Sequence, residues 1–182
     1  TKEYYINDYG NQIINFTKSV YLRIREIKYD EEFLKSKDLY PGEYIIENGK
    51  KIIDANKNEE FKNFDKSFIL LKEESLKYSM ELIKSDLKKL GIEHDNFFSE
   101  TELVEKKLVD KAVNQLKDDK YVLNGYLDAP KGEVDKDWKK TKRLIFKSTL
   151  FGDDTDRAMQ KNDGTWTYFA NDVAYHMDKV QR

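Results

Sequence analysis

The chain has 182 residues, enough for one folded core or for a core with a smaller appendage. Its 12 Tyr and 10 Phe exclude a disordered chain, and its net charge of -2 gives no global positive field of the kind that nucleic-acid-binding proteins carry. The absence of Cys excludes disulfides, thiolate catalysis and Cys-based zinc sites, and two His residues are too few for a His-rich metal site.

The N-terminal segment predicts a strand, a turn and a long helix. Residues 2–6 read as the strand, 7–10 as a polar turn closed by Gly10, and 11–29 as the helix, whose apolar residues recur at helical spacing. A strand that passes directly into a helix places side chains at the carboxyl end of a sheet, where open α/β folds bind ligands. Two interpretations remain open for Asn7, Asp8 and Gln12: they contact a ligand at this corner, or they cap the helix.

The middle of the chain predicts mainly helices. A loop at 38–42 contains Pro and Gly, helices are expected at 43–56 and 67–90, and an extended segment follows at 92–98. Next, 99–102 has the pattern of a capping box, which predicts one helix running on to Leu116. His94 is expected at the surface in a loop.

Strands return after residue 120. They are predicted at 121–127, 144–146 and 157–161, with an acidic loop at 152–156. Between the first two strands, 128–142 forms a polar excursion that ends in the basic run 139–143. Such a run is usually a solvated face, and the alternative interpretation is a phosphate contact.

A second strand–helix corner is predicted at 163–180. Asp163-Gly164 is a tight-turn dipeptide, 165–169 is β-branched and aromatic, and Asn171 and Asp172 offer N-cap chemistry for a helix. The helical spacing i, i+4 and i+8 places Tyr168, Asp172 and His176 on one stripe. In the purely structural alternative, Asp172 caps the helix, Tyr168 is core and His176 is surface.

The helical middle thus lies between two strand–helix corners about 150 residues apart, which suggests a nucleotide-binding sheet interrupted by an insertion. The chain has no glycine-rich phosphate-binding motif, no complete calcium loop and no Ser/His/Asp triad. The residues alone therefore predict two candidate ligand corners without a complete catalytic set. Both ends read as cut inside secondary structure, and we expect a fragment of a longer, cytoplasmic protein without a membrane partner.

Four segments carry a resemblance to a known family. They are Tyr4–Ile13, containing Asn-Asp-Tyr-Gly-Asn-Gln-Ile; Leu90–Glu100, with Leu-Gly-Ile and Asp-Asn-Phe-Phe-Ser-Glu; Phe146–Arg157, with Phe-Lys-Ser-Thr and Gly-Asp-Asp-Thr-Asp-Arg; and Asn162–His176. In this order the segments resemble the bacterial-type arginyl-tRNA synthetases, which are class I aminoacyl-tRNA synthetases. The likeness spans nearly the whole chain and is weakest at 30–66 and 128–142. The family's ATP-binding His-x-Gly-His element, its Lys-Met-Ser-Lys-like loop and its anticodon-binding domain are not in this sequence.

The resemblance implies an α/β fold: a partial Rossmann-type catalytic core at 1–29 and 146–182, with a largely helical insertion at 30–145. It implies an arginine–tRNA ligase as the parent enzyme, with arginine, ATP with Mg²⁺ and arginine tRNA as its partners. In that reaction the arginine carboxylate attacks the α-phosphate of ATP to form arginyl-adenylate, and the terminal ribose hydroxyl of the tRNA then takes the arginyl group. The insertion is expected to position the acceptor end of the tRNA, with 139–143 as a candidate phosphate contact.

By the same resemblance, Asp172 and Tyr168 match the family's arginine-recognition positions, with His176 as a further site-lining residue. A planar guanidinium favours a carboxylate that accepts two N–H bonds, so physical chemistry supports the same assignment for Asp172. No catalytic residue and no metal site are predicted, and the fragment is expected to be inactive alone, without a tightly bound cofactor. The alternatives are a stand-alone RNA-binding module and a protein-interaction module, and exposed cut surfaces would also favour self-association.

Overall fold

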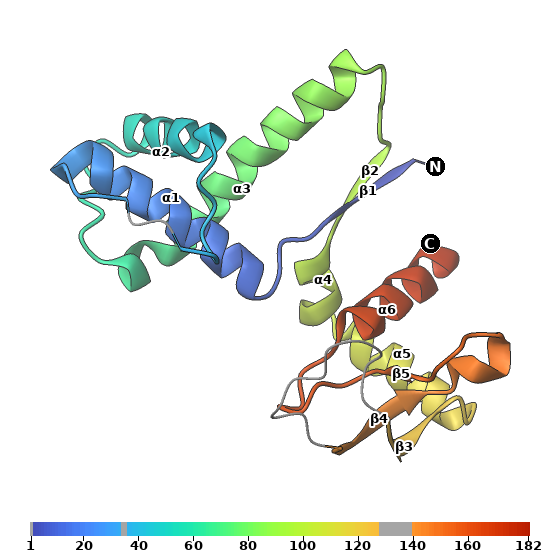
Figure 1. The fold of residues 1–182 in the computed structure, drawn as a ribbon. Coiled ribbons are helices and arrows are strands. Elements are labelled where there is room, and N and C mark those ends of the chain that lie inside the picture. The colour runs from blue at the N-terminus through green and yellow to red at the C-terminus, as the bar shows by residue number, and fades with distance from the viewer. Residues whose placement is uncertain (1, 34–35, 128–139) are drawn as a thin grey trace. The chain divides into compact units, whose positions relative to one another are not determined.

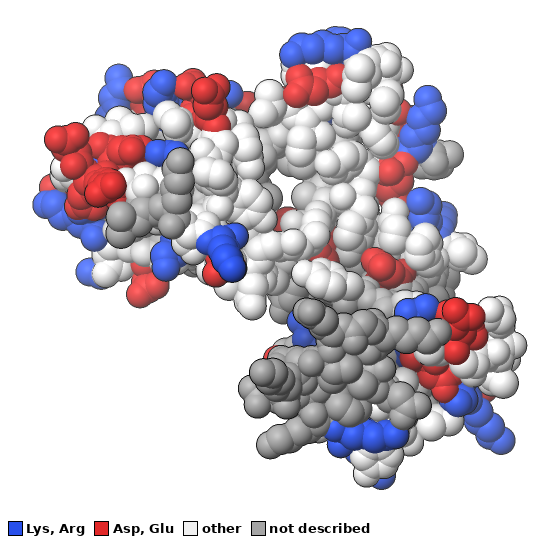
Figure 2. Space-filling model, in the orientation of Figure 1, with Lys and Arg blue, Asp and Glu red and all other residues white. Residues whose placement is uncertain are grey.

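The computed structural model describes residues 2–33, 36–127 and 140–182, and it divides into two compact units, Thr1–Ser99 and Glu100–Arg182. Figure 1 draws the elements of the two units as ribbons, and Figure 2 shows that Lys, Arg, Asp and Glu side chains of both signs lie on the surface in the same view. No helix in the described parts of the chain combines the length and the apolar character needed to cross a bilayer.

The first unit joins a two-stranded parallel sheet to three helices. Strand β1 (Glu3–Ile6) leads into α1 (Asn11–Tyr29), then α2 (Glu43–Ala55) and α3 (Phe64–Lys89), and the chain returns as β2 (Asn96–Ser99). The two strands pair in register from Glu3 opposite Asn96 to Ile6 opposite Ser99. This crossover confirms the predicted first strand–helix corner, and the three helices lie within a few residues of their predicted bounds.

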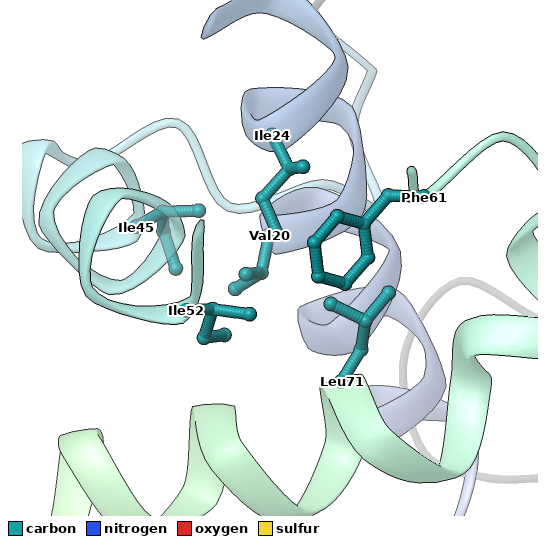
Figure 3. Close-up of a cluster of buried hydrophobic side chains, with 6 residues drawn as sticks. All are labelled: Val20, Ile24, Ile45, Ile52, Phe61 and Leu71. Atoms are coloured by element: carbon teal, nitrogen blue, oxygen red, sulfur yellow. The ribbon is translucent and has the colours of Figure 1, made fainter. Parts of the chain in front are cut away.

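The core of this unit lies where its three helices meet. Figure 3 shows side chains from all three helices and from the loop before α3 converging on one cluster: Val20, Ile24, Ile45, Ile52, Phe61 and Leu71. All six are at most 1% exposed. Gly49 of α2 faces α1, and a Cβ at this position would lie 3.4 Å from the side chain of Ile24, an ordinary van der Waals contact.

The second unit packs helices against a small antiparallel sheet. It contains α4 (Glu100–Glu105), α5 (Leu108–Asp118), β3 (Val122–Tyr126), β4 (Lys142–Phe146), the 3-10 helix η1 (Ser148–Phe151), β5 (Arg157–Ala158) and α6 (Tyr168–Gln181). The strand order is β3-β4-β5, and α5 packs against both α6 and β3. Its core draws on α4, α5 and α6 and on the sheet, with Leu103, Val113 and Met159 all 0% exposed.

Three predictions about local structure in this unit were wrong. The single helix expected from 99–102 to Leu116 is two helices, because Lys107 takes a left-handed conformation with φ 53° between α4 and α5. The strand expected at 165–169 is only an isolated bridge between Gln160 and Trp166. The strand expected at 157–161 is limited to β5.

The helix cap at the second corner also differs from the prediction. Thr167 is the N-cap of α6, and its hydroxyl accepts a hydrogen bond from the backbone N–H of Ala170 at 3.3 Å. A threonine that serves as a cap ends the extended segment, and the helix therefore begins at Tyr168. Asn171 and Asp172 lie inside the helix and do not cap it.

The division into a catalytic core at 1–29 and 146–182 and an insertion at 30–145 stays a prediction. Of the basic run 139–143, Lys139 lies outside the described residues, as does most of the excursion 128–142. The run ends in β4, where Arg143 donates to the hydroxyl of Thr141 at 2.7 Å.

Candidate functional site

The three residues predicted to share a stripe lie on one exposed face of α6. Tyr168 is 64% exposed and opens the helix, and Asp172 and His176 follow at intervals of four residues, both exposed. In an α-helix this spacing places side chains one above another. The stripe therefore presents a phenol, a carboxylate and an imidazole to the same side of the helix.

Neither Tyr168 nor Asp172 has the structural role that the alternative interpretation assigned to it. Tyr168 is not core, and Asp172 lies beyond the first turn, where Thr167 already caps the helix. Within residues 2–33, 36–127 and 140–182, the side chain of Asp172 takes part in no hydrogen bond or ion pair, and the Lys161 ammonium lies 6.0 Å from the centre of the Tyr168 ring. His176 is exposed, with its ring 5.2 Å from that of Tyr175, and its role as a site-lining residue stays a prediction.

A neighbouring face of α6 is held in place by a buried polar contact. Asn171 is 8% exposed, and its side-chain N–H donates to the carboxylate of Glu100 at 2.8 Å. Glu100 is itself only 3% exposed at the start of α4. A buried hydrogen bond to a carboxylate is strong and directional, so it limits rotation of α6 about its own axis. The residue next to Asp172 thus fixes the direction in which the stripe points.

The turn before α6 is built from Asp163 and Gly164, as predicted. Gly164 has φ 84°, and the carboxylate of Asp163 accepts from the backbone N–H of Thr165 at 2.9 Å and from its hydroxyl at 2.6 Å. The two hydrogen bonds from Thr165 lower the pKa of Asp163, the hydroxyl contributing most. Asp163 therefore stays ionised and holds the segment that leads into the cap of α6.

The first strand–helix corner is also a candidate site, because a cavity of about 310 Å³ opens beside it in the first unit. Asn7 and Gln12, two of the three residues predicted to contact a ligand here, line this cavity. The other walls come from β1, α1, the loop before α2, the first turn of α2, and α3. Their residues are Tyr4, Ile6, Ile13, Phe16, Tyr40, Tyr44, Leu76, Ser79, Met80 and Ile83.

Asp8, the third predicted corner residue, does not line the cavity. Its carboxylate accepts a hydrogen bond from the hydroxyl of Ser99 at 2.6 Å, which links the ends of the two parallel strands. The capping interpretation is also wrong for the corner, since the N-cap of α1 is Gly10, with φ 86°, and no side chain caps this helix. Ser99 directly precedes α4 as the capping box predicts, and its hydroxyl donates its hydrogen to Asp8.

His94 differs from the surface residue that was expected. It is half-buried before β2, with its ring edge-on to Tyr4 at 5.5 Å and 5.8 Å from Phe97. This packing fixes the ring of Tyr4, which forms part of the wall of the cavity. The sequence carried no signal for the contact, because 90 residues separate its two partners.

Comparison with known proteins finds relatives among the arginine–tRNA ligases. An arginine–tRNA ligase of Pelagibacter ubique is 53% identical to this chain, and that of Ehrlichia chaffeensis is 46% identical, in each case over 100% of this chain. The chain is a homologue of the arginine–tRNA ligases. It spans 32% of the first of these relatives and 31% of the second, about a third of their length. No protein-family model matches the chain.

The fold leads to the same family. A crystal structure described as an arginyl-tRNA synthetase of Campylobacter jejuni matches with a TM-score of 0.79 at 28% identity, over 99% of this chain and 36% of that one. The mixed helices and sheets of the two units accordingly have the α/β fold of part of a synthetase, as the four sequence segments implied.

Proposed function

We propose that this chain is the part of an arginine–tRNA ligase that recognises the arginine side chain, through Tyr168, Asp172 and His176 on α6. The observation that supports this most is the exposure of Tyr168 and Asp172 in a helix whose cap and core need neither of them. A solvent-facing carboxylate without a partner is the group to which a guanidinium binds in the forked, two-bond geometry.

The proposed roles follow from the chemistry of each side chain. Asp172 accepts two N–H bonds from the guanidinium, and the ring of Tyr168, one turn earlier, covers its flat face. His176 lies one turn further along the same stripe, where it contacts the rest of the amino acid. The buried pair of Asn171 and Glu100 keeps α6 in the rotation that presents these groups.

For the complete enzyme we propose the reaction of its homologues: attachment of arginine to its tRNA in the cytoplasm at the expense of ATP with Mg²⁺. The residues of this chain serve the arginine side of that reaction, and no chemical step is assigned to them. Positioning and charge stabilisation supply most of the catalysis in such a reaction. The basic run at 139–143 stays a candidate contact for a tRNA phosphate. Homology to ligases does not favour the alternative of a free-standing RNA-binding or interaction module.

The test is Asp172→Asn in a complete ligase that carries this segment. A hydrogen bond to a charged group contributes roughly 1.5–3 kcal/mol, so we expect the KM for arginine to rise by about one to two decades. Asp178→Asn, in the same helix but off the stripe, is the matched control and should leave this KM unchanged. An arginine KM that is the same in Asp172→Asn and in the unmodified enzyme would reject the assignment.

The 182-residue chain allows a second, direct measurement. Calorimetry with arginine, with lysine and citrulline as controls for charge and shape, should show weak binding that is selective for arginine. Asp172→Ala should abolish the signal. If lysine and arginine bind with equal affinity, the forked geometry of the guanidinium does not contribute to recognition.

A further inference from the structure

The turn that leads into α6 carries a lysine beside the proposed arginine site. The backbone of Lys161 is held on both sides, because its N–H donates to the carbonyl of Thr165 at 2.8 Å and its carbonyl accepts from Gly164 at 3.2 Å. Lys161 is exposed, and its ammonium lies over the ring of Tyr168, 6.0 Å from the ring centre. A held backbone with an exposed side chain lets the ammonium approach this ring or swing away from it.

The side chain of Lys161 takes part in no hydrogen bond and no ion pair in the part of the chain that the structure describes. The acidic residue of the same turn, Asp163, already accepts two hydrogen bonds from Thr165. These two hydrogen bonds are the main cause that lowers the pKa of Asp163, and the charge of Lys161 adds to the effect from a longer distance. Among the described residues, the face of the Tyr168 ring is therefore the contact that the ammonium makes.

One aromatic ring does not hold two cations equally well. The negative face of the ring attracts an ammonium or a guanidinium within about 6 Å of its centre, and the ammonium of Lys161 lies at the limit of this range. Two cations on the same face repel each other directly. Two cations on opposite faces weaken each other's attraction, because each draws the ring electrons toward itself. In either arrangement, a guanidinium binds best to the Tyr168 ring when the ammonium has left it.

We propose that Lys161 is a built-in competitor for arginine: in the empty site its ammonium lies against the Tyr168 ring, and arginine displaces it on binding. The inference rests on the proposed function of α6 and concerns the regulation of that same site. Its consequence is that the side chain of Lys161 lowers the affinity for arginine, although it touches neither Asp172 nor the fork of the guanidinium.

Attachment to the neighbouring turn makes Lys161 an effective competitor. A group that is tethered within reach of its site has an effective concentration on the order of millimolar. A free amine that offers a single ammonium gains nothing at the ring that Lys161 does not already supply. Arginine gains more, because its fork also donates two N–H bonds to Asp172, which an ammonium cannot match. The competition is therefore overcome by arginine and not by a simple amine.

The first experiment tests the contact itself, by NMR of the 182-residue chain. Protons that lie over a tyrosine ring are shifted upfield by its ring current. We expect the ε-methylene protons of Lys161 to lie upfield of those of other exposed lysines, and Tyr168→Leu to remove this shift. Addition of arginine should also remove it. Citrulline, which has a planar end group without the charge, should leave it in place.

The second experiment measures the arginine affinity of three variants by NMR titration. Lys161→Met removes the charge and keeps the linear side chain, and we expect arginine to bind about two- to fivefold tighter, the size of an exposed cation–π contact. Lys161→Arg keeps a cation and should bind arginine no more tightly than the unmodified chain. The matched control is Lys111→Met, which removes one positive charge from an exposed position of α5 in the same unit and should leave the affinity unchanged.

A double variant separates competition at the ring from a general effect of charge. In a chain that carries Tyr168→Leu, the ring is gone, so we expect Lys161→Met to have no further effect on the arginine affinity. The two changes are then coupled, as expected for groups in contact. An equal gain from Lys161→Met with and without the ring would show that Lys161 acts only as a distant charge, and it would overturn the inference.

The results also separate this inference from the proposed function. Arginine binding that Asp172→Ala abolishes, and that Lys161→Met leaves unchanged or weakens, keeps the arginine site and overturns the competitor. Unshifted ε-methylene protons of Lys161 in the free chain overturn the competitor as well, whatever the affinity. Arginine binding that is absent from the chain and from Lys161→Met alike rejects the site on α6, and the competitor with it.

Discussion

Two carboxylates hold the loop between η1 and β5, and they show how single side chains shape the second unit. Asp153 accepts two hydrogen bonds from Arg157, at 2.6 and 2.8 Å, and Asp156 is paired with Lys147 at 2.5 Å. The hydroxyl and backbone N–H of Thr149 also donate to Asp156. The acidic loop expected at 152–156 is therefore linked to its own basic neighbours, which pair with two of its three carboxylates.

The first prediction concerns the charge of Asp153. Hydrogen bonding from Arg157 is the largest influence on this carboxyl and lowers its pKa from 3.8 to about 2. Because the folded-state pKa is depressed, the pair stabilises the fold above the ordinary pKa, and this stabilisation is lost as the pH falls through about 2. We expect Arg157→Met to raise the pKa of Asp153 toward 3.8, measured by NMR titration of its side-chain carboxyl carbon.

The expected rise is incomplete, because the backbone N–H of Asp154 still donates to Asp153 at 2.8 Å. Lys161→Met is the control, since it removes a positive charge from the same unit without touching this pair. A pKa that stays near 2 in Arg157→Met would show that the arginine is not what holds the carboxylate in its charged form.

At the scale of whole elements, the junction of α4 and α5 is one of four places in the described residues where a residue other than glycine has a positive φ. Lys107 has φ 53°, and backbone hydrogen bonds from Lys106 to Glu102 and from Lys107 to Val104 close the end of α4. A left-handed conformation costs an ordinary residue roughly 1–2 kcal/mol, and glycine avoids this cost. Lys107 therefore holds a left-handed backbone conformation that lysine disfavours and glycine would adopt readily.

The second prediction follows from that strain. Lys107→Gly should raise the free energy of unfolding by about 0.5–1 kcal/mol, because the relief of strain exceeds the extra chain entropy that glycine has when unfolded. Lys111→Gly is the matched control: Lys111 is exposed inside α5, and there glycine should lower stability by a similar amount. Urea unfolding measures the free energy of unfolding of both variants. If Lys107→Gly is less stable than the unmodified chain, the lysine side chain stabilises the fold by more than its left-handed backbone destabilises it.

The same junction shows which elements could be predicted from the sequence. The helices at 11–29, 43–55 and 64–89 were predicted to within a few residues, because apolar side chains recur along each at helical spacing. The break at Lys107 gave no such signal, since lysine is a good helix former and its left-handed backbone is set by the packing around it. The cap at Thr167 was missed for a related reason: a β-branched residue beside aromatic ones also fits a strand.

The residues of the candidate sites also fall into two groups, those that the sequence predicted and those that it did not. The stripe on α6 was predictable because its three residues belong to one helix, where spacing alone determines which side chains share a face. At the first corner, Asn7 and Gln12 were predicted from the strand–helix boundary. Tyr40, Tyr44 and Ser79 were not, because the cavity they complete depends on contacts between helices far apart in the sequence. Periodicity describes one element at a time and carries no information about such contacts.

On the scale of the whole chain, the structure consists of two units with separate cores, and the chain offers a way to observe each one. Leu71 in the first unit and Leu103 in the second are both 0% exposed, so they form a matched pair of core positions. Both tryptophans of the chain, Trp138 and Trp166, follow Ser99 in the sequence, and Trp166, the one that the structure describes, belongs to the second unit. The two longest helices of the described residues, α1 and α3, lie in the first unit. Tryptophan fluorescence therefore reports on the second unit, and far-UV circular dichroism is weighted toward the first.

The third prediction is that each core mutation shifts mainly one of the two signals. Leu→Ala in a packed core costs about 2–5 kcal/mol, because transfer free energy is lost and a cavity remains. We expect Leu71→Ala to lower the urea midpoint detected by circular dichroism, with little change in the midpoint detected by fluorescence. Leu103→Ala should do the reverse, and the two midpoints should separate in both variants. Superimposable fluorescence and circular-dichroism transitions in both variants would instead show that the units unfold as one cooperative structure, because probes of a two-state transition must coincide.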